Sequence, residues 1–298
     1  MLWIEEVEKD CWINTVDPTD PERRRLIEEV GVKKHFITNS LDPGERPHID
    51  KENEQLLVIL DVPLKTNESR QEYTTRPLGI VLLDNTVVTI CKHAFSALEP
   101  FKRGEVKDFS PSKKGKFLLL IALRIAQQYL SYLKDLTKWR EEIERELRKS
   151  MKNEELYALL DLEESLVYFT TSLKANEGVL EKLTKLEGFS TIAEERELME
   201  DARIEMNQAL SMANIYSNIL SGMMDAFASV ISNNLNIVMK FLASIAIVIA
   251  IPTIVASFFG MNVALPFQSH PHAFLIILLL SVFLAGSVAG LLAIWKMF

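Results

Sequence analysis

Residues Phe241–Phe259 read FLASIAIVIAIPTIVASFF, nineteen residues without a charged side chain. As a helix this stretch is about 28 Å long, close to the thickness of the hydrocarbon core of a bilayer. A second run, Ala273–Trp295, is also free of Asp, Glu, Lys and Arg, and it is long enough to span with some tilt. Two successive uncharged runs of this length are rare in a water-soluble core. The sequence therefore predicts transmembrane helices at 241–259 and 273–295, joined by a short loop at 260–272.

The charge of the chain lies before these two runs. The 298 residues carry 33 Lys+Arg and 41 Asp+Glu, a net charge of −8 at pH 7. Removing Lys296, the one charged residue after position 240, leaves 32 basic and 41 acidic side chains in the first 240 residues. An acidic body with an apolar tail excludes a soluble enzyme with one core and argues against nucleic acid as a partner. Two distant cysteines, Cys11 and Cys91, exclude a disulfide scaffold.

The flanking residues predict how the two spans are oriented. The first residues, Met1–Glu6, are acidic and lack the apolar core of a signal peptide. Lys240 precedes the first span and Lys296 follows the second, whereas the loop between the spans has no Lys or Arg. Positive residues favour the cytoplasmic side of a membrane. We therefore expect a multi-pass protein of the cell (inner) membrane, with both termini in the cytoplasm and the loop outside.

Residues 1–112 mix short β-like runs with turns, which predicts a cytoplasmic α/β domain. Strands are expected at 55–62, 79–83 and 86–90, the last two as a hairpin around Asp84-Asn85. Asp20-Pro21-Glu22 predicts a helix start, with Asp20 as the N-cap. The sequence contains no phosphate loop, dinucleotide fingerprint or nucleophile elbow in this part. We therefore expect no enzymatic activity.

Residues 113–240 predict a helical stalk, with breaks near 151–153 and at Gly188. A Thr-x-x-Glu capping box at 191–194 begins a last helix that continues to Phe259, about 100 Å in length. Two heptad rows, called here the seam, run along this helix, and eleven of their twelve positions are apolar. The seam consists of Met199, Met206, Ala213, Leu220, Phe227 and Asn234, with Ala202, Ala209, Tyr216, Met223, Val230 and Ile237.

The seam has two interpretations. The plain one is an ordinary helical bundle or coiled-coil stalk. The second is a homo-oligomer, because a two-span chain offers the seam no partner large enough to enclose a conduit. The direct continuation of the stalk into a membrane span favours mechanical coupling between the cytoplasmic body and the membrane.

The first span ends in Gly260-Met261-Asn262 and is preceded by an Asn-x-x-Met-Lys segment, Asn236–Lys240, and by Ser221-Gly222-Met223-Met224-Asp225. In this arrangement the motifs resemble those of the CorA family of divalent-cation channels, and the resemblance covers essentially the whole chain. It implies a homo-oligomeric, pentameric funnel in the lipid bilayer that admits Mg²⁺, and also Co²⁺ or Ni²⁺. It further implies gating by cytoplasmic Mg²⁺ bound between subunits, without an organic cofactor.

Small residues follow one face of the first span. Asn236, Ala243, Ala250 and Ser257 recur every two turns, with Thr253 close to the same face. Taken alone, this stripe fits close helix packing as well as it fits a pore lining. Because two spans cannot enclose a pore, a conduit needs several copies of the chain. The resemblance favours a pore lined by the first span.

The resemblance also assigns roles at both ends of that pore. Gly260, Met261 and Asn262 form the selective outer mouth, where oxygens hold hydrated Mg²⁺, an ion that loses its water reluctantly. Met239 and Leu242 match positions that narrow the pore. Ala250 stands at a third constriction, where the family usually has a bulkier residue.

The same resemblance identifies regulatory metal ligands. Asp201 matches a stalk acid that shares a regulatory Mg²⁺ between neighbouring subunits, and Asp225 is expected near the inner mouth as a second member of this set. The partner acid in the N-terminal domain stays open between Asp42, Asp50 and Asp61.

Two features depart from the family pattern. The loop has no acidic residue after Asn262, and the tail after the second span lacks a basic cluster. His270 and His272 form a His-x-His sequence, but two histidines without a third ligand are more often plain solvated residues.

Two other functions stay open from the sequence. The Gly-Met-Asn sequence does not fix the ion, so a Zn²⁺ transporter of the ZntB type is an alternative within the family. A non-conducting, membrane-anchored coiled-coil interaction protein would explain the stalk and spans, but it would leave Gly260–Asn262 and Asn236 without a role.

Overall fold

The computed structural model describes residues 11–66, 73–84, 86–106, 110, 113–150, 153–186, 192–263, 265–266 and 270–295. The chain divides into two compact units, Met1–Gly222 and Met223–Phe298. One helix, α6 (Ala193–Phe259), contributes residues to both units. The expected domain boundaries at 112 and 240 stay predictions.

The first unit contains a five-stranded sheet in the order β1-β5-β4-β3-β2. The strands are β1 (Cys11–Val16), β2 (His48–Glu52), β3 (Gln55–Lys65), β4 (Tyr73–Leu82) and β5 (Thr86–Cys91). Only β1 and β5 pair in parallel among these strands. The predicted hairpin joins β4 to β5, where the backbone N–H of Leu83 donates to the carbonyl of Thr86 at 2.9 Å. Asn85, the second residue of the expected turn, lies outside the described residues.

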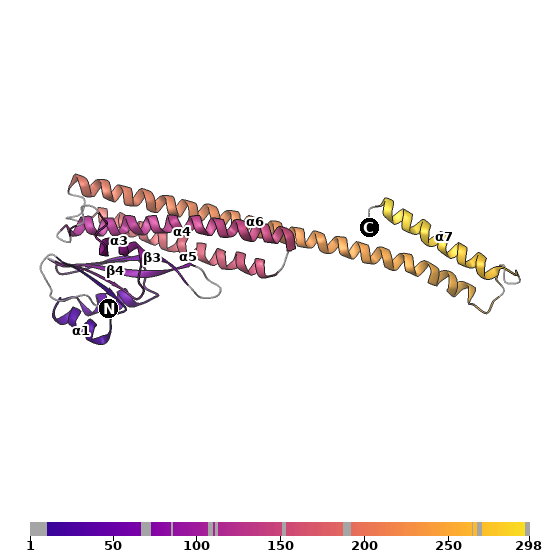
Figure 1. Ribbon diagram of the computed structural model, residues 1–298, viewed down its shortest axis with the longest axis horizontal. Helices are drawn as coiled ribbons and strands as arrows, with labels where there is room; N and C mark the ends of the chain where they lie inside the picture. The colour runs from indigo at the N-terminus through magenta and orange to yellow at the C-terminus, as the bar shows by residue number, and fades with distance from the viewer. Residues whose placement is uncertain are drawn as a thin grey trace. The chain divides into compact units, whose positions relative to one another are not determined.

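Two short helices, α1 (Asp20–Glu28) and α2 (Lys34–Leu41), cover one face of the sheet (Figure 1). Their buried side chains Leu26 and Phe36 join the core formed with Leu57, Ile59 and Val88 of the sheet. Close contact of α2 with β4 explains Gly79, where a Cβ would lie 1.8 Å from the Ser40 Oγ.

The predicted N-cap of α1 is wrong by one residue. Thr19 is the N-cap, and its backbone N–H donates to the Glu22 carboxylate at 2.7 Å. Thr and Asp are both good N-caps, so the order of residues 19–22 does not decide between them.

The long helices α4 (Lys114–Ser150) and α5 (Asn153–Thr184) cover the opposite face of the sheet (Figure 1). A short 3-10 turn (Ser96–Leu98) and α3 (Glu99–Lys102) connect the sheet to them. The aromatic rings of Tyr73, Tyr129 and Phe169 meet edge-on at this interface, with centroid separations of 5.1 Å for Tyr129–Phe169 and 6.1 Å for Tyr73–Phe169. Because helices cover both faces, all six positions of β5 are buried.

The long helix α6 agrees closely with the predicted helix at 191–259, although Thr191 of the capping box lies outside the described residues. Lys116, near the start of α4, pairs with Glu194 at the start of α6, with an Nζ–Oε1 distance of 2.6 Å. The two helices therefore begin side by side and run in the same direction (Figure 1).

In the first unit the seam is covered by the chain itself, which corrects the expectation that it lacks a partner there. Six seam residues are at most 3% exposed: Met199, Ala202, Met206, Ala209, Ala213 and Leu220. The ordinary-bundle interpretation is therefore right for this half. Beyond Gly222 the seam residues Val230 and Ile237 are 41% and 53% exposed.

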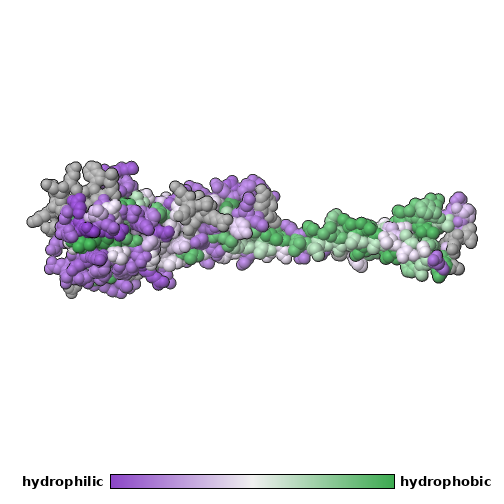
Figure 2. Space-filling model, turned by 90° about the horizontal axis from the view of Figure 1, so that it is seen from below, coloured by the Kyte–Doolittle hydropathy of each residue, from purple (hydrophilic) through white to green (hydrophobic). Residues whose placement is uncertain are grey.

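The second unit consists of α6 from Met223 onward and α7 (Ala273–Ile294). Both helices are long and apolar enough to cross a membrane. Among the described residues of this unit, the buried positions are Ser244 and Val255 on α6 and Ser281 and Leu292 on α7, and they mark where the two helices face each other. Figure 2 shows hydrophobic surface over the exposed flanks of these helices.

Candidate functional site

The Gly260-Met261-Asn262 sequence directly continues the last turn of α6. The backbone N–H of Gly260 donates to the carbonyl of Ala256 at 2.9 Å, and that of Met261 to the carbonyl of Phe258 at 3.3 Å. A Cβ on Gly260 would lie 3.2 Å from the Ala256 carbonyl oxygen, so a larger residue would crowd this turn. Asn262 follows with an exposed side chain. Helix α6 thus ends in a hydrogen-bonded turn that is followed by an exposed polar amide.

The seven predicted pore-lining residues are all exposed in the single chain. They are Asn236, Met239, Leu242, Ala243, Ala250, Thr253 and Ser257. At 100° per residue they occupy one side of α6, roughly opposite the side on which Ser244 and Val255 are buried. This face of α6 is therefore turned away from α7 and is left uncovered by its own chain.

Polar atoms on this face are few and uncharged. The Thr253 hydroxyl donates to the carbonyl of Ile249 at 3.3 Å, which leaves its oxygen lone pairs directed outward. The face can therefore offer hydroxyl and amide oxygens but no carboxylate.

The two predicted regulatory acids, Asp201 and Asp225, are both exposed on α6, in different units. Asp201 shares its face of the helix with three exposed isoleucines, Ile204, Ile215 and Ile219, which are 54%, 54% and 42% exposed. This second apolar stripe is distinct from the buried seam. Within the described residues, no group of three His, Cys, Asp or Glu side chains is positioned to hold a metal ion.

The three candidate partner acids are in different environments. Asp42 is exposed, and its Oδ1 accepts from the backbone N–H of Gly44 at 2.9 Å. Asp50 is partly exposed, with its Oδ2 at 3.5 Å from the His35 Nε2. Asp61 faces the interface between the sheet and α5, where Ser172 donates to its Oδ2 at 2.7 Å. The Asp61 carboxylate is thus already engaged within its own chain, whereas Asp42 and Asp50 are more accessible.

A buried polar cluster around Asp61 was not predicted from the sequence. The Asn176 side chain bonds both to the backbone N–H and to the carbonyl of Asp61, each at 2.8 Å, and the Tyr129 hydroxyl donates to the same carbonyl at 3.1 Å. Burial raises the pKa of the Asp61 carboxyl, while the Ser172 hydrogen bond and the charge of Arg76 oppose the rise. The sequence signal was present, because Ser172 and Asn176 interrupt the apolar face of α5.

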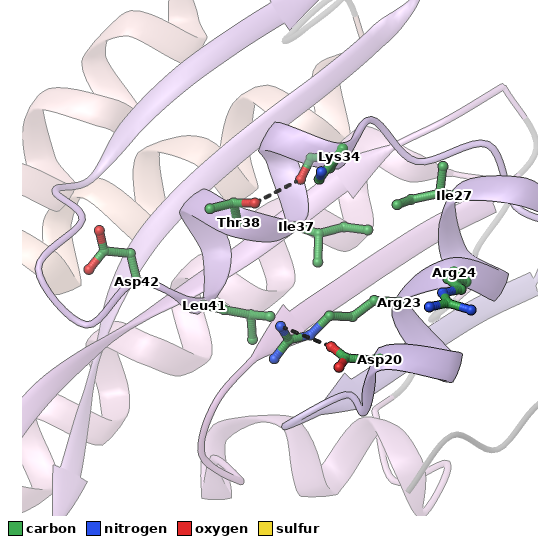
Figure 3. Close-up of a pocket in the computed structure, with 9 residues that line it drawn as sticks. All are labelled: Asp20, Arg23, Arg24, Ile27, Lys34, Ile37, Thr38, Leu41 and Asp42. Carbon is green, nitrogen blue, oxygen red and sulfur yellow. Dashed lines mark hydrogen bonds and ion pairs between the residues drawn. The ribbon is translucent and has the colours of Figure 1, made fainter.

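A surface hollow of about 680 Å³ lies between α1 and α2 (Figure 3). It is lined by Asp20, Arg23, Arg24, Ile27, Lys34, Ile37, Thr38, Leu41 and Asp42. The Arg23 side chain is used locally, since its Nε donates to the carbonyl of Pro18 at 2.9 Å and its guanidinium lies 3.8 Å from Asp20. Charges of both signs line this hollow, and it does not involve the predicted site residues other than Asp42.

Comparison with known proteins agrees with this arrangement. The family model described as "CorA-like Mg2+ transporter protein" matches residues 8–294. A cobalt/magnesium transport protein CorA from Methanocaldococcus jannaschii is 29% identical over 281 residues, which cover 91% of this chain and 86% of the relative. The complete structure of the CorA magnesium transporter from the same organism superimposes with a TM-score of 0.84 at 28% identity, covering 95% of this chain and 89% of that one.

A more distant structural likeness is to the cytoplasmic domain of ZntB from Vibrio parahaemolyticus. Its TM-score is 0.62 at 12% identity, with 77% of this chain and 93% of that chain covered. At this identity the likeness shows a shared fold alone. The match of the family model over nearly the whole chain is decisive, and the protein belongs to the family of CorA-like Mg²⁺ transporter proteins.

Proposed function

We propose that copies of this chain assemble into a pentameric channel of the inner membrane that admits Mg²⁺ to the cytoplasm, with Co²⁺ or Ni²⁺ as further permeant ions. The observation that carries this proposal is the continuity of α6, a single helix from Ala193 to Phe259 that ends in Gly260-Met261-Asn262. Such a helix can couple events in the aqueous unit to the face that would line the conduit. Both termini are cytoplasmic in this proposal.

The exposed faces of α6 support assembly from several copies. Two membrane helices cannot enclose a conduit, and the predicted lining face is turned away from α7. In the first unit the stripe of Ile204, Ile215 and Ile219 is left uncovered by the chain, although each is a large apolar side chain. Contact between stripes of neighbouring copies would remove this surface from water.

The chemistry of the lining supports a hydrated dication as the cargo. Mg²⁺ keeps several of its waters and prefers oxygen ligands, so amide, hydroxyl and carbonyl oxygens can hold the hydrated ion. Asn236 near the inner end and Asn262 at the outer end supply such oxygens, and Met239 and Leu242 narrow the path between them. The cobalt/magnesium transport named for the relative agrees with this class of ion.

Regulation in this proposal depends on Asp201 and Asp225. Carboxylates from adjoining acidic subunits repel one another, and a bound Mg²⁺ removes that repulsion and ties the stalks together. The ion shifts the equilibrium only because it binds the closed arrangement more tightly than the open one. The exposed position of Asp201, beside the isoleucine stripe, is what such a shared site requires.

A Zn²⁺ transporter of the ZntB type has no specific support, because the likeness to the ZntB domain shows the fold alone. Flux into proteoliposomes with Mg²⁺, Co²⁺, Ni²⁺ and Zn²⁺ in turn decides between the ions. We expect Mg²⁺ influx in the wild type. Uptake of Zn²⁺ with no uptake of Mg²⁺ would overturn the main proposal.

The same assay tests the outer mouth through Asn262→Ala. The variant is expected to elute as the same oligomer as the wild type and to lose Mg²⁺ uptake, because the amide oxygen that receives the hydrated ion is gone. Val263→Ala, at the next exposed position, is the matched control and should conduct normally. Unimpaired uptake by Asn262→Ala would contradict the assignment of the mouth, and a wild-type monomer in mild detergent would contradict the channel.

A further inference from the structure

The end of the second unit that joins α6 to α7 carries two histidines that the proposed channel does not use. His270 and His272 are the only residues with an ionisable side chain between positions 241 and 295. Both are exposed. No carboxylate or thiol occurs in this part of the sequence, so imidazole is its one strong metal-binding group.

The start of α7 holds the backbone of both histidines. The N–H of Ala273 donates to the carbonyl of His270 at 3.0 Å, and the N–H of Ile276 donates to the carbonyl of His272 at 3.1 Å. The two residues are therefore fixed relative to each other by the first turn of a helix, which lowers the entropy lost when a ligand joins their side chains.

The rings are within reach of one ion. Their centroids are 6.0 Å apart, with the ring planes inclined at 55°. A tetrahedral ion bound at about 2.0–2.1 Å to one nitrogen of each ring would bring the centroids to about 5 Å. Rotation of the two exposed side chains can close this difference of about 1 Å.

Two local features oppose binding. The backbone N–H of His272 donates to the Nδ1 of His270 at 3.2 Å, and an ion that binds either nitrogen of His270 displaces this contact or shifts its proton. The N-terminus of α7 also carries partial positive charge, which disfavours a cation. A single histidine would therefore bind weakly, and chelation by both is needed.

We propose that His270 and His272 together bind a borderline divalent ion such as Ni²⁺, Co²⁺ or Zn²⁺. Imidazole suits these ions, whereas Mg²⁺ prefers oxygen ligands, so the site discriminates against the main cargo. Water, or the histidine pair of a neighbouring copy, completes the coordination. The site faces the outside only if the proposed orientation of the channel is correct, and in that respect the inference rests on the proposed function.

Direct binding tests the site without any transport. The full-length protein in detergent, purified with a tag that contains no histidine, is titrated with Ni²⁺ in the presence of excess Mg²⁺, which occupies oxygen sites. We expect His270→Ala and His272→Ala each to weaken Ni²⁺ binding at least tenfold and the double variant to lose one site per chain. His48→Ala, a histidine of the first unit, is the matched control and should bind as the wild type does. Equal Ni²⁺ binding by the wild type and the double variant would overturn the proposal.

A transport assay then tests where the site lies. Ni²⁺ added only outside proteoliposomes should inhibit Mg²⁺ uptake by the wild type at a concentration at least tenfold lower than it inhibits the double variant. If neither the wild type nor the double variant takes up Mg²⁺ but the two still differ in Ni²⁺ binding, the proposed channel is refuted and the histidine metal site is supported. If Mg²⁺ uptake is normal and Ni²⁺ acts equally on both proteins, the site at the outer mouth is refuted.

Discussion

The two units of the chain differ in how far they bury the apolar side chains of α6. In the first unit, other parts of the chain bury the apolar seam of α6, and Met206 is fully buried. In the second unit the same helix leaves large apolar residues exposed, among them Met239 at 59% and Leu242 at 56%. Within α6, residues Phe241–Phe259 carry no charged side chain. One continuous helix therefore passes from a part whose seam its own chain buries to a part whose large apolar side chains its own chain leaves mostly exposed.

Replacing either of two methionines on α6 by alanine tests this difference in burial. Met206→Ala should destabilise the first unit by about 2–5 kcal/mol, because it leaves a cavity in a closed core. Met239→Ala is the matched control, and it should leave the unfolding of that unit unchanged because Met239 contacts solvent in the single chain. Thermal unfolding of the full-length variants in detergent, followed by circular dichroism, measures both. An equal loss of stability in the two variants would contradict the difference in burial between the two parts of α6.

Features set by composition over a long stretch were predictable from the sequence. The expected helix at 191–259 and the second span at 273–295 differ from α6 and α7 by two residues or fewer at each end. Long uncharged runs and heptad rows give strong signals because many residues contribute to each. The hairpin of β4 and β5 was likewise predictable from two short apolar runs separated by the Asp84-Asn85 turn.

Short or polar elements were missed. Strand β2, with the sequence HIDKE, has almost no apolar side chains and is defined by its pairing with β3. Helix α2 is eight residues long and contains β-branched residues, so its helical state depends on burial of Phe36 and Ile37 against the sheet. The Asp61 cluster combines residues more than 100 positions apart, and no local pattern brings Asp61 to Asn176.

Asp201 is an exception within the first unit, because it lies on the exposed face of α6 that carries the isoleucine stripe and not on the buried seam. Asp201→Lys should raise the Mg²⁺ concentration that half-protects the first unit from protease at least tenfold, a change of about 1.4 kcal/mol in binding. The physical reason is that a tethered cation replaces a ligand of the shared ion. Glu200→Lys makes the same change of charge one residue earlier, on another face of the helix, and should have a much smaller effect.

Protease protection and Mg²⁺ inhibition of flux are to be measured together in both variants. If both curves of Asp201→Lys coincide with those of the wild type, Asp201 is a solvated surface acid. Regulation by Mg²⁺ would then have to depend on other residues.

The smallest expected effect concerns Asp61, a partly buried carboxylate of the first unit, in contrast to residues 241–295, which contain no Asp, Glu, Lys or Arg. Burial raises the pKa of this carboxyl above its ordinary value. The folded state therefore favours the protonated form of Asp61. The free energy of unfolding falls as the pH rises from the ordinary pKa through the raised one, and above that pH the loss of stability stays constant.

Asp61→Asn keeps the shape of the side chain and can still accept a hydrogen bond from Ser172, but it removes the charge. The variant should match the wild type in acid and exceed it at pH 8 by a few degrees in Tm at most, because the Ser172 hydrogen bond and Arg76 offset part of the cost. Asp84→Asn, the same substitution at an exposed position, is the control and should leave the Tm at pH 8 close to that of the wild type. A lower Tm for Asp61→Asn than for the wild type at pH 8 would mean that the ionised carboxylate stabilises the interface between the sheet and α5, and that the polar interior of this unit is held together by charge.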